Sequence, residues 1–193
     1  MVKTTTEFSK SLKSLESLIS RNIPSVNFNN RPLGEVDLLV IHCASLPEGE
    51  YNNTILEELF SGAISPNTLL QLGLAGDLQV STHLYIKRDG EIIQFVPLDK
   101  RAWHAGQSEF QGRTNCNDFS IGIELQGTVT TEFTQAQYVA LIKLTKIIMD
   151  LYPKITPDRI VGHSVIAPSR KQDPGVKFNW QFYLANITSN ITL

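Results

Sequence analysis

The feature that most constrains the fold is a mostly apolar run, VDLLVIH, from Val36 to His42. Its apolar and β-branched residues predict a buried strand that ends at a histidine. A similar run, Phe119–Leu125, predicts a second strand, in which alternate side chains face opposite ways. Ile121, Ile123 and Leu125 would then share one face, with Glu124 on the other.

Other segments predict a hairpin and a third short strand. The stretches 82–88 and 91–96 are strand-like, and Asp89-Gly90 between them is a strong signal for a tight turn. Residues 159–162 predict a further strand. Because these strands alternate with helices but include a hairpin, the expected fold class is α/β, a single domain with a central mixed β-sheet flanked by helices.

The clearest helix begins at Thr134, where Gln137 completes a capping box, and ends before Pro153. Its apolar residues follow a period of 3.6. A last helix is expected at 179–185, and one short helix near 54–60 within an otherwise loop-rich stretch from Pro47 to about Val80. Long irregular stretches in compact domains are usually functional, often forming the rim of a binding site.

The first residues predict an amphipathic helix with one apolar face, on which Phe8, Leu12, Leu15 and Ile19 lie. Charged residues interrupt every window in which a secretory signal would need its apolar region. We therefore divide the 193 residues into an N-terminal helical extension, 1–30, and one main domain, 31–193. The expected location is the cytoplasm.

Composition narrows the possible partners. Seventeen Lys and Arg against 19 Asp and Glu give a net charge of −2, so there is no general reason to bind nucleic acid or an anionic membrane. No apolar stretch is long enough to span a membrane. The two cysteines, Cys43 and Cys116, cannot build a disulfide framework, which suits a reducing compartment. No obligate protein partner is evident.

Three residues could form a metal site. Of the four histidines, His42 and His163 directly follow strand-like runs, and Asp173 lies ten residues after His163. Two imidazoles and a carboxylate are a catalytic zinc set that leaves a fourth position for water. The spacing matches no short ligand motif, so ordinary buried or surface histidines remain the alternative.

Two further residues could carry out proton transfer and charge stabilisation. Glu124 lies in the middle of a strand, where a carboxylate is unexpected unless its face opens on a cleft. It could move a proton beside a metal, or it could lie on a solvated face. Lys171 precedes Asp173 by two residues and could stabilise an oxyanion, or it could be a surface charge.

Four residues around these have two interpretations each. Trp103 and His104 could stack on a sugar, or they could be a buried tryptophan beside a structural histidine. His83, inside a strand, favours a supporting role. Cys43 next to His42 suggests a thiol nucleophile, but neighbouring strand residues point to opposite faces, so proton transfer between them is disfavoured.

Together, the segments resemble the zinc-dependent N-acetylmuramoyl-L-alanine amidases of the amidase-2 family. They are most similar to its AmpD-type branch, the cytosolic 1,6-anhydro-N-acetylmuramyl-L-alanine amidases. The matching segments cover about 36–180 and read LLVIHCASLPEGEY, VSTHLYIKRDGEIIQFVPLDKRAWHAG, FQGR, CNDFSIGIELQGT and GHSVIAPSRKQDPG.

The resemblance implies a fold, a reaction and roles for the residues. The zinc ligands would be His42, His163 and Asp173, the acid and base Glu124, and the oxyanion-stabilising residue Lys171. The substrate would be a cytosolic anhydro-muropeptide from peptidoglycan recycling, cleaved between the lactyl group and L-alanine, with an indirect effect on β-lactamase induction. We expect substrate contacts from five residues: Trp103, His104, His83, Cys43 and Arg113.

The substrate rim departs from the family pattern at three positions. Cys43 stands where close relatives have Asn, Gln79 where they have Arg, and Asn115 where they tend to have a basic residue. The rival functions are a wall-lytic or phage-type amidase, a zinc-free peptidoglycan-binding module, and a metallo-hydrolase of another amide. A substrate assay separates them.

Overall fold

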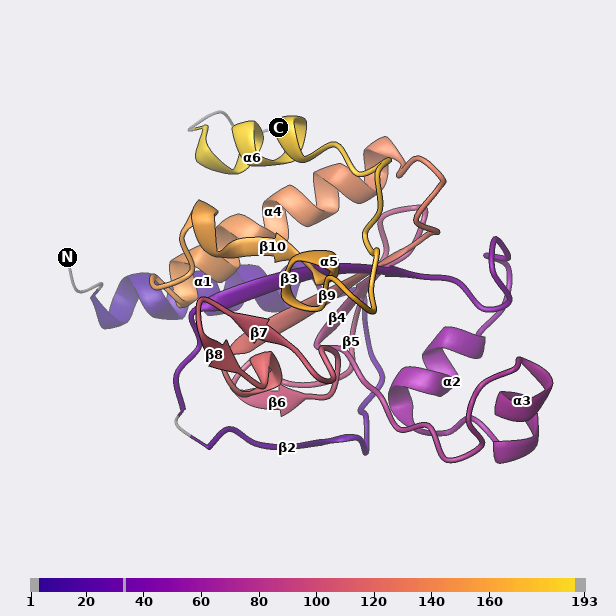
Figure 1. Cartoon of the computed structure of the whole chain (residues 1–193). Helices are drawn as coiled ribbons and strands as arrows, with labels where there is room; N and C mark the ends of the chain where they lie inside the picture. Colours follow the sequence, from indigo (N-terminus) through magenta and orange to yellow (C-terminus); the bar gives the residue numbers. More distant parts are fainter. Residues whose placement is uncertain (1–3, 33, 190–193) are drawn as a thin grey trace.

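A mixed sheet of six strands forms the centre of the computed structural model, which describes residues 4–32 and 34–189 (Figure 1). The strand order is β1-β5-β4-β9-β3-β10, in which β4, β9, β3 and β10 run parallel to one another and β5 runs antiparallel to β4. The strands of this sheet are β1 (Arg21–Asn22), β3 (Leu38–Ala44), β4 (Leu84–Ile86), β5 (Ile92–Gln94), β9 (Ser120–Gln126) and β10 (Ile160–Gly162). The predicted mixed sheet flanked by helices is confirmed.

Two small antiparallel sheets and several helices complete the fold. The small sheets pair β2 (Phe28–Asn30) with β6 (Lys100–Ala102), and β7 (Glu109–Phe110) with β8 (Arg113–Thr114). The helices are α1 (Thr5–Leu18), α2 (Ile55–Ser61), α3 (Pro66–Gln71), α4 (Gln135–Leu151), α5 (His163–Ile166), α6 (Trp180–Thr188) and the 3₁₀ turns η1 (Cys116–Asp118) and η2 (Pro157–Arg159). No helix in the described part of the chain is long and apolar enough to cross a membrane.

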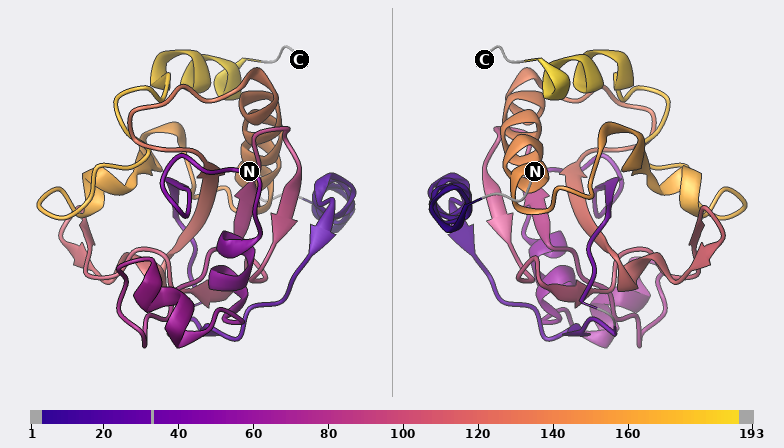
Figure 2. Two further views of the ribbon diagram at one scale, coloured as in Figure 1. Left: turned by 90° about the vertical axis from the view of Figure 1, so that its right-hand side faces the viewer. Right: turned by 90° about the vertical axis from the view of Figure 1, so that its left-hand side faces the viewer.

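Helix α4 covers one face of the sheet. Helices α1 and α6 both pack against α4 (Figures 1 and 2). The predicted face of β9, Ile121, Ile123 and Leu125, is fully buried in this core, together with Leu39 and Ile41 of β3. The alternate residues of both strands point the other way. That second face, on which His42 and Glu124 lie, is covered by the short helices α2, α3 and α5 and by loops rather than by a long helix.

The N-terminal segment contributes one strand to the central sheet and one to a small sheet. Helix α1 begins with a capping box between Thr4 and Glu7, and its Leu15 is buried against the α4 side, whereas Phe8 is 48% exposed. Strand β1 pairs with β5, and β2 pairs with β6. The predicted helix is confirmed. The domain boundary near residue 30 stays a prediction, and positions 1–3 and 190–193 of the two predicted segments lie outside the described residues.

The loop-rich stretch contains more structure than expected. The predicted short helix is α2, but α3 follows it, with Ser65 as its N-cap and Pro66 in its first turn. The two hairpin strands are shorter than predicted, because β4 and β5 pair over three residues each. The turn itself is confirmed, since Gly90 adopts a φ of 90° and the Asp89 carboxylate accepts the Glu91 amide.

Candidate metal centre

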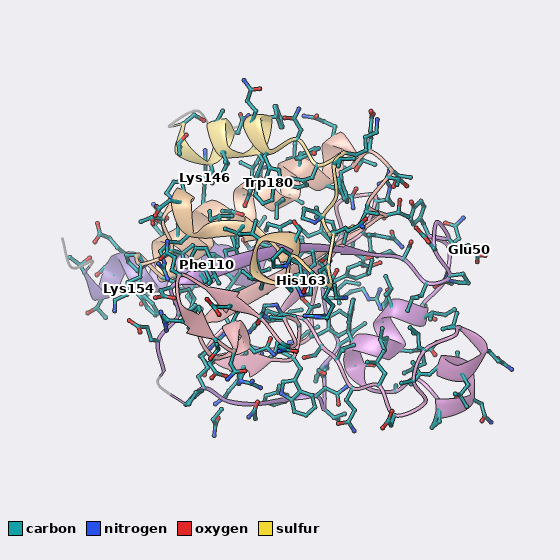
Figure 3. All side chains as sticks on the ribbon, in the orientation of Figure 1. Glu50, Phe110, Lys146, Lys154, His163 and Trp180 are labelled. Atoms are coloured by element: carbon teal, nitrogen blue, oxygen red, sulfur yellow. The ribbon has the colours of Figure 1, made fainter. Side chains whose placement is uncertain are left out.

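Three neighbouring parallel strands place the candidate residues in one row. His42 of β3 is in register with Glu124 of β9, and Ile41 is in register with Gly162 of β10. His163, the residue after Gly162, therefore lies beside His42. Because the carboxyl ends of parallel strands meet at one edge of a sheet, Glu124, His42 and His163 come together there. Figure 3 shows His163 near the centre of the molecule, where α5 begins.

Asp173 reaches this row through a loop that lies close against β10. The Ser164 amide donates to the Asp173 carbonyl at 3.0 Å. A Cβ atom on Gly162 would approach the Pro174 ring to 2.7 Å and the Asp173 carbonyl to 3.3 Å. The glycine before His163 thus allows the loop to bring the Asp173 carboxylate next to both histidines.

The three side chains converge on one point. His42 Nδ1 lies 2.9 Å from His163 Nδ1, and Asp173 Oδ2 lies 3.0 Å and 3.1 Å from these two nitrogens. All three residues are buried. Nitrogen and oxygen ligands about 2.0–2.2 Å from one zinc ion stand at comparable separations from one another. The group can hold a metal ion.

Hydrogen bonds support this interpretation. His163 Nε2 lies 3.1 Å from the Ala105 carbonyl, which can only accept, so this nitrogen carries the proton and the Nδ1 lone pair faces the cluster. Asp173 is acceptor-only when ionised. Only a proton on His42 Nδ1 or a cation can therefore hold the three atoms together.

The charges at the site also suit a metal. Burial lowers the pKa of His42 to about 4, so its imidazole is neutral near pH 7 and can act as a ligand. Burial opposes ionisation of Asp173, but its contacts with His163 and His42 lower the pKa of this carboxyl below its usual value. A neutral His42 imidazole and an ionised Asp173 carboxylate result.

The Glu124 side chain is half-buried, and its Oε2 atom is buried with no hydrogen-bond partner among the residues that the structure describes. Burial raises the pKa of Glu124 well above its usual value, the Asp173 carboxylate raises it further, and Lys171 opposes both effects. A carboxyl with a raised pKa beside a possible metal site can both accept and return a proton near neutral pH. Lys171 is half-buried on the loop that carries Asp173.

Two cavities, both lined in part by Val129, are formed by residues that are sequence neighbours of the row. One, of about 270 Å³, is lined by Cys43 and Ala44 at the end of β3 and by Gly127 and Thr128 after β9. The other, of about 420 Å³, is lined by Lys171, Pro174 and their neighbours.

The predicted substrate contacts lie in different places. Trp103 is partly exposed, and its indole donates to the Asn29 side chain at 2.9 Å. His104 is buried and contacts His42 through Nδ1 at 2.9 Å, so it is placed to support a ligand rather than to stack on a sugar. His83 is completely buried, with Nδ1 accepting the Gly122 amide and Nε2 donating to the Lys100 carbonyl.

The structure does not bring Arg113 to the site, which corrects the expectation of a substrate contact there. Its guanidinium pairs with Asp37 at 2.6 Å and stacks on the Phe119 ring. Asp37 precedes β3, five residues before His42, which is about 16 Å at 3.3 Å a residue. Arg113 thus lies toward the amino ends of the central strands. The sequence motif that contains it does not show this position.

Cys43 borders the smaller cavity but is not placed as a nucleophile. It is on the opposite side of β3 from His42, partly packed against the α4 core, and its thiol donates to the Pro174 carbonyl at 3.6 Å. Burial and then the Glu124 charge raise the pKa of this thiol well above its usual value, so the reactive thiolate is disfavoured.

Two supporting groups had no clear signal in the sequence. The Ala105 carbonyl orients His163 and also accepts from Arg170 at 2.8 Å. The Asn117 side-chain oxygen accepts the backbone amides of His104 and Ala105. The Ala105 group is a main-chain carbonyl, which any residue type provides, whereas Asn117 acts through its side chain, whose reach to residues 104–105 the local sequence does not show.

Comparison with known proteins identifies the class of enzyme. The N-acetylmuramoyl-L-alanine amidase family, Amidase_2, matches residues 32–176. The chain belongs to this family, which confirms the predicted amidase. A curated relative from Escherichia coli strain K12, the 1,6-anhydro-N-acetylmuramyl-L-alanine amidase AmpD, is 47% identical over 174 residues, 90% of this chain and 94% of the relative.

Comparison with solved structures supports the same family assignment. A crystal structure of a selenomethionine derivative of AmpD has a TM-score of 0.83 and 48% identity, covering 87% of this chain and 94% of that one. The amidase AmiD from E. coli, in complex with the substrate anhydro-N-acetylmuramic acid-L-Ala-D-gamma-Glu-L-Lys, has a TM-score of 0.62 and 34% identity. That match covers 78% of this chain and 57% of AmiD. The resemblance to the AmpD-type branch is thereby confirmed.

Proposed function

We propose that this chain is a zinc-dependent amidase that cleaves the bond between the lactyl group of 1,6-anhydro-N-acetylmuramic acid and L-alanine of the stem peptide. The observation that carries the proposal is the buried convergence of His42, His163 and Asp173 beside the unpartnered carboxyl of Glu124. The substrate class is supported by the similarity to AmpD across nearly the whole chain.

Zinc fits the donor set better than Mg²⁺ or Ca²⁺ does. Imidazole nitrogen with one carboxylate oxygen is typical of catalytic zinc, whereas Mg²⁺ and Ca²⁺ favour sites made of oxygen ligands. When bound, zinc supplies Lewis acidity to the scissile carbonyl and to the attacking water. His42, His163 and Asp173 would hold it.

Glu124 is the proposed proton carrier. In the described part of the chain Oε2 has no hydrogen-bond partner, so it can take a proton from the attacking water, and the raised pKa favours holding that proton. The same carboxyl then delivers that proton to the amide nitrogen as the carbon–nitrogen bond breaks. L-alanine leaves as an amine, and the lactyl group becomes a carboxylic acid.

Lys171 is the proposed stabiliser of the negative charge that develops on the carbonyl oxygen. Its loop carries Asp173, and its charge reaches both His42 and Glu124. Cys43 lines the smaller cavity, and Trp103 is partly exposed beside Asn29; both remain proposed substrate contacts. The buried contacts of His104 and His83 support a role in orienting the site instead.

We further propose that the enzyme acts in the cytoplasm on soluble anhydro-muropeptides from peptidoglycan recycling, with an indirect effect on β-lactamase induction. No nucleic acid, membrane or obligate protein partner is needed for this reaction. The near-neutral charge of the chain supports this part of the proposal.

The test offers the zinc-loaded enzyme two substrates and identifies the products by mass spectrometry. One is a soluble anhydro-muropeptide, and the other is intact sacculi. We expect free stem peptide and the anhydro-sugar from the first, at a much higher rate than any release from the second. Equal rates would favour a lytic amidase. Binding without products would favour a peptidoglycan-binding module, and cleavage of another amide alone would favour a different hydrolase.

A further inference from the structure

A chain of hydrogen bonds runs from the candidate metal site into the interior. His42 Nε2 lies 2.9 Å from His104 Nδ1, and His104 Nε2 lies 3.1 Å from the Ser120 hydroxyl. The Ser120 hydroxyl donates to the Cys116 carbonyl at 2.6 Å. This series of hydrogen bonds therefore ends at a buried backbone carbonyl.

Because the last acceptor is a carbonyl, which has no proton to give, the position of each proton along this series of hydrogen bonds is determined. Ser120 has a single hydroxyl proton, which goes to Cys116, so its oxygen must accept from His104 Nε2. A neutral His104 with its proton on Nε2 has a lone pair on Nδ1. That lone pair accepts from His42 Nε2, and the remaining nitrogen of His42, Nδ1, is left with its lone pair facing His163 and Asp173.

We propose that His104 and Ser120 are positioning residues that hold His42 in the tautomer required for metal binding. This inference rests on the proposed metal site and extends it to residues that do not touch the ion. With His42 fixed in this way, no proton remains among His42 Nδ1, His163 Nδ1 and Asp173 Oδ2. A cation is then the group that can hold these three atoms together.

The structure holds His104 rigidly enough for this role. Its backbone amide donates to the Asn117 side chain at 3.0 Å, and the ring lies against Gly122 of β9. A Cβ atom on Gly122 would come within 2.5 Å of the ring, so a strand position that is otherwise unfavourable for glycine makes room for the imidazole.

One short segment thus orients both histidines of the site. The His104 side chain directs His42, and the carbonyl of the next residue, Ala105, directs His163. The Asn117 oxygen accepts the amides of both positions. Partners of this kind typically change metal affinity by about 10- to 100-fold when they are removed.

The first experiment reads the tautomers directly. Long-range ¹H–¹⁵N NMR of the full chain at neutral pH distinguishes the two ring nitrogens of each histidine. After chelation, we expect the proton of His42 and of His104 to be on Nε2. A proton on Nδ1 of either residue would overturn the proposal, whatever the protein then does with zinc.

The second experiment measures zinc affinity by competition with a chromophoric chelator. Ser120→Ala removes the acceptor of His104, and His104→Leu removes the acceptor of His42. Each should weaken zinc binding about 10- to 100-fold. His104→Asn, which keeps an oxygen near the position of Nδ1, should bind zinc more tightly than His104→Leu.

Ser25→Ala is the matched control. Ser25 is also a buried serine that donates to a main-chain carbonyl, that of Phe60 at 2.5 Å, but it lies outside the hydrogen-bond chain. The zinc affinity of the Ser25→Ala variant should equal that of the wild type. Wild-type affinity in both Ser120→Ala and His104→Leu would refute the positioning role. Failure of the wild type to bind zinc would instead refute the proposed function, while the NMR result would still decide the tautomers.

Discussion

Replacing Glu124 with Gln should make the enzyme far slower and the protein more stable. The amide keeps the shape of the carboxyl but can neither take up nor return a proton. Because a positioned acid or base contributes typically 100- to 10,000-fold, kcat should fall by about that factor. Metal content should stay the same, since Glu124 is not among the three converging ligands.

The stability change follows from the raised pKa of Glu124. Burial and the nearby Asp173 carboxylate favour the protonated form in the folded state, so the folded protein holds this proton more tightly than the unfolded chain does. Wild-type stability should therefore fall as the pH rises from about 4.3, the unfolded value, through the folded pKa. Each unit of the shift costs about 1.4 kcal/mol at higher pH.

The assay is urea unfolding of the metal-free wild type and Glu124→Gln at pH 4, 6 and 8. The free energy of unfolding of the variant relative to the wild type should increase with pH. Glu50→Gln is the control, because Glu50 is exposed and lies well away from His163 in Figure 3. A pH-independent difference would refute the raised pKa, and an unchanged kcat would refute the role in proton transfer.

Three further predictions concern charge stabilisation, substrate binding and the fold. Lys171→Ala should keep its metal and lose about 100- to 1,000-fold in kcat with little change in KM, measured by steady-state kinetics; a large rise in KM alone would make Lys171 a substrate holder. Trp103→Ala should raise KM more than it lowers kcat in the same assay, and an unchanged KM would remove Trp103 from the proposed contacts. Arg31→Met should reduce the free energy of unfolding by about 2–4 kcal/mol, because the buried guanidinium of Arg31 donates to four main-chain carbonyls that would lose their donors. A loss below about 1 kcal/mol in urea unfolding would contradict that estimate.

The central strands and α4 could be predicted because their signals are local. The apolar run into His42 and the alternation around Glu124 depend only on neighbouring residues, as does the capping box at Thr134. The short strands β1, β2 and β6 to β8 could not be predicted this way, because two or three residues carry no periodicity and pair through tertiary contacts. Ser65 before Pro66 is a local start signal for α3, although no helix was predicted there.

The candidate metal site could be predicted only in part, because some of its contacts follow from the strand pattern and others arise only from tertiary folding. His42 and His163 follow strands whose ends meet in the sheet, so their neighbourhood follows from the strand pattern. The orientation of His104 and His83 depends on how the segment around residue 104 folds over β9, which the local sequence does not determine. Arg113 illustrates the opposite error, since it lies in a matching motif but pairs with Asp37 away from the site.

The central claim is that one zinc ion held by His42, His163 and Asp173 enables amide hydrolysis. The most direct measurement titrates zinc into the chelated full-length protein while following cleavage of a soluble anhydro-muropeptide. The account predicts no activity at the start and a linear rise that saturates at about one zinc per chain. Full activity in the chelated protein, or saturation without zinc uptake, would contradict it.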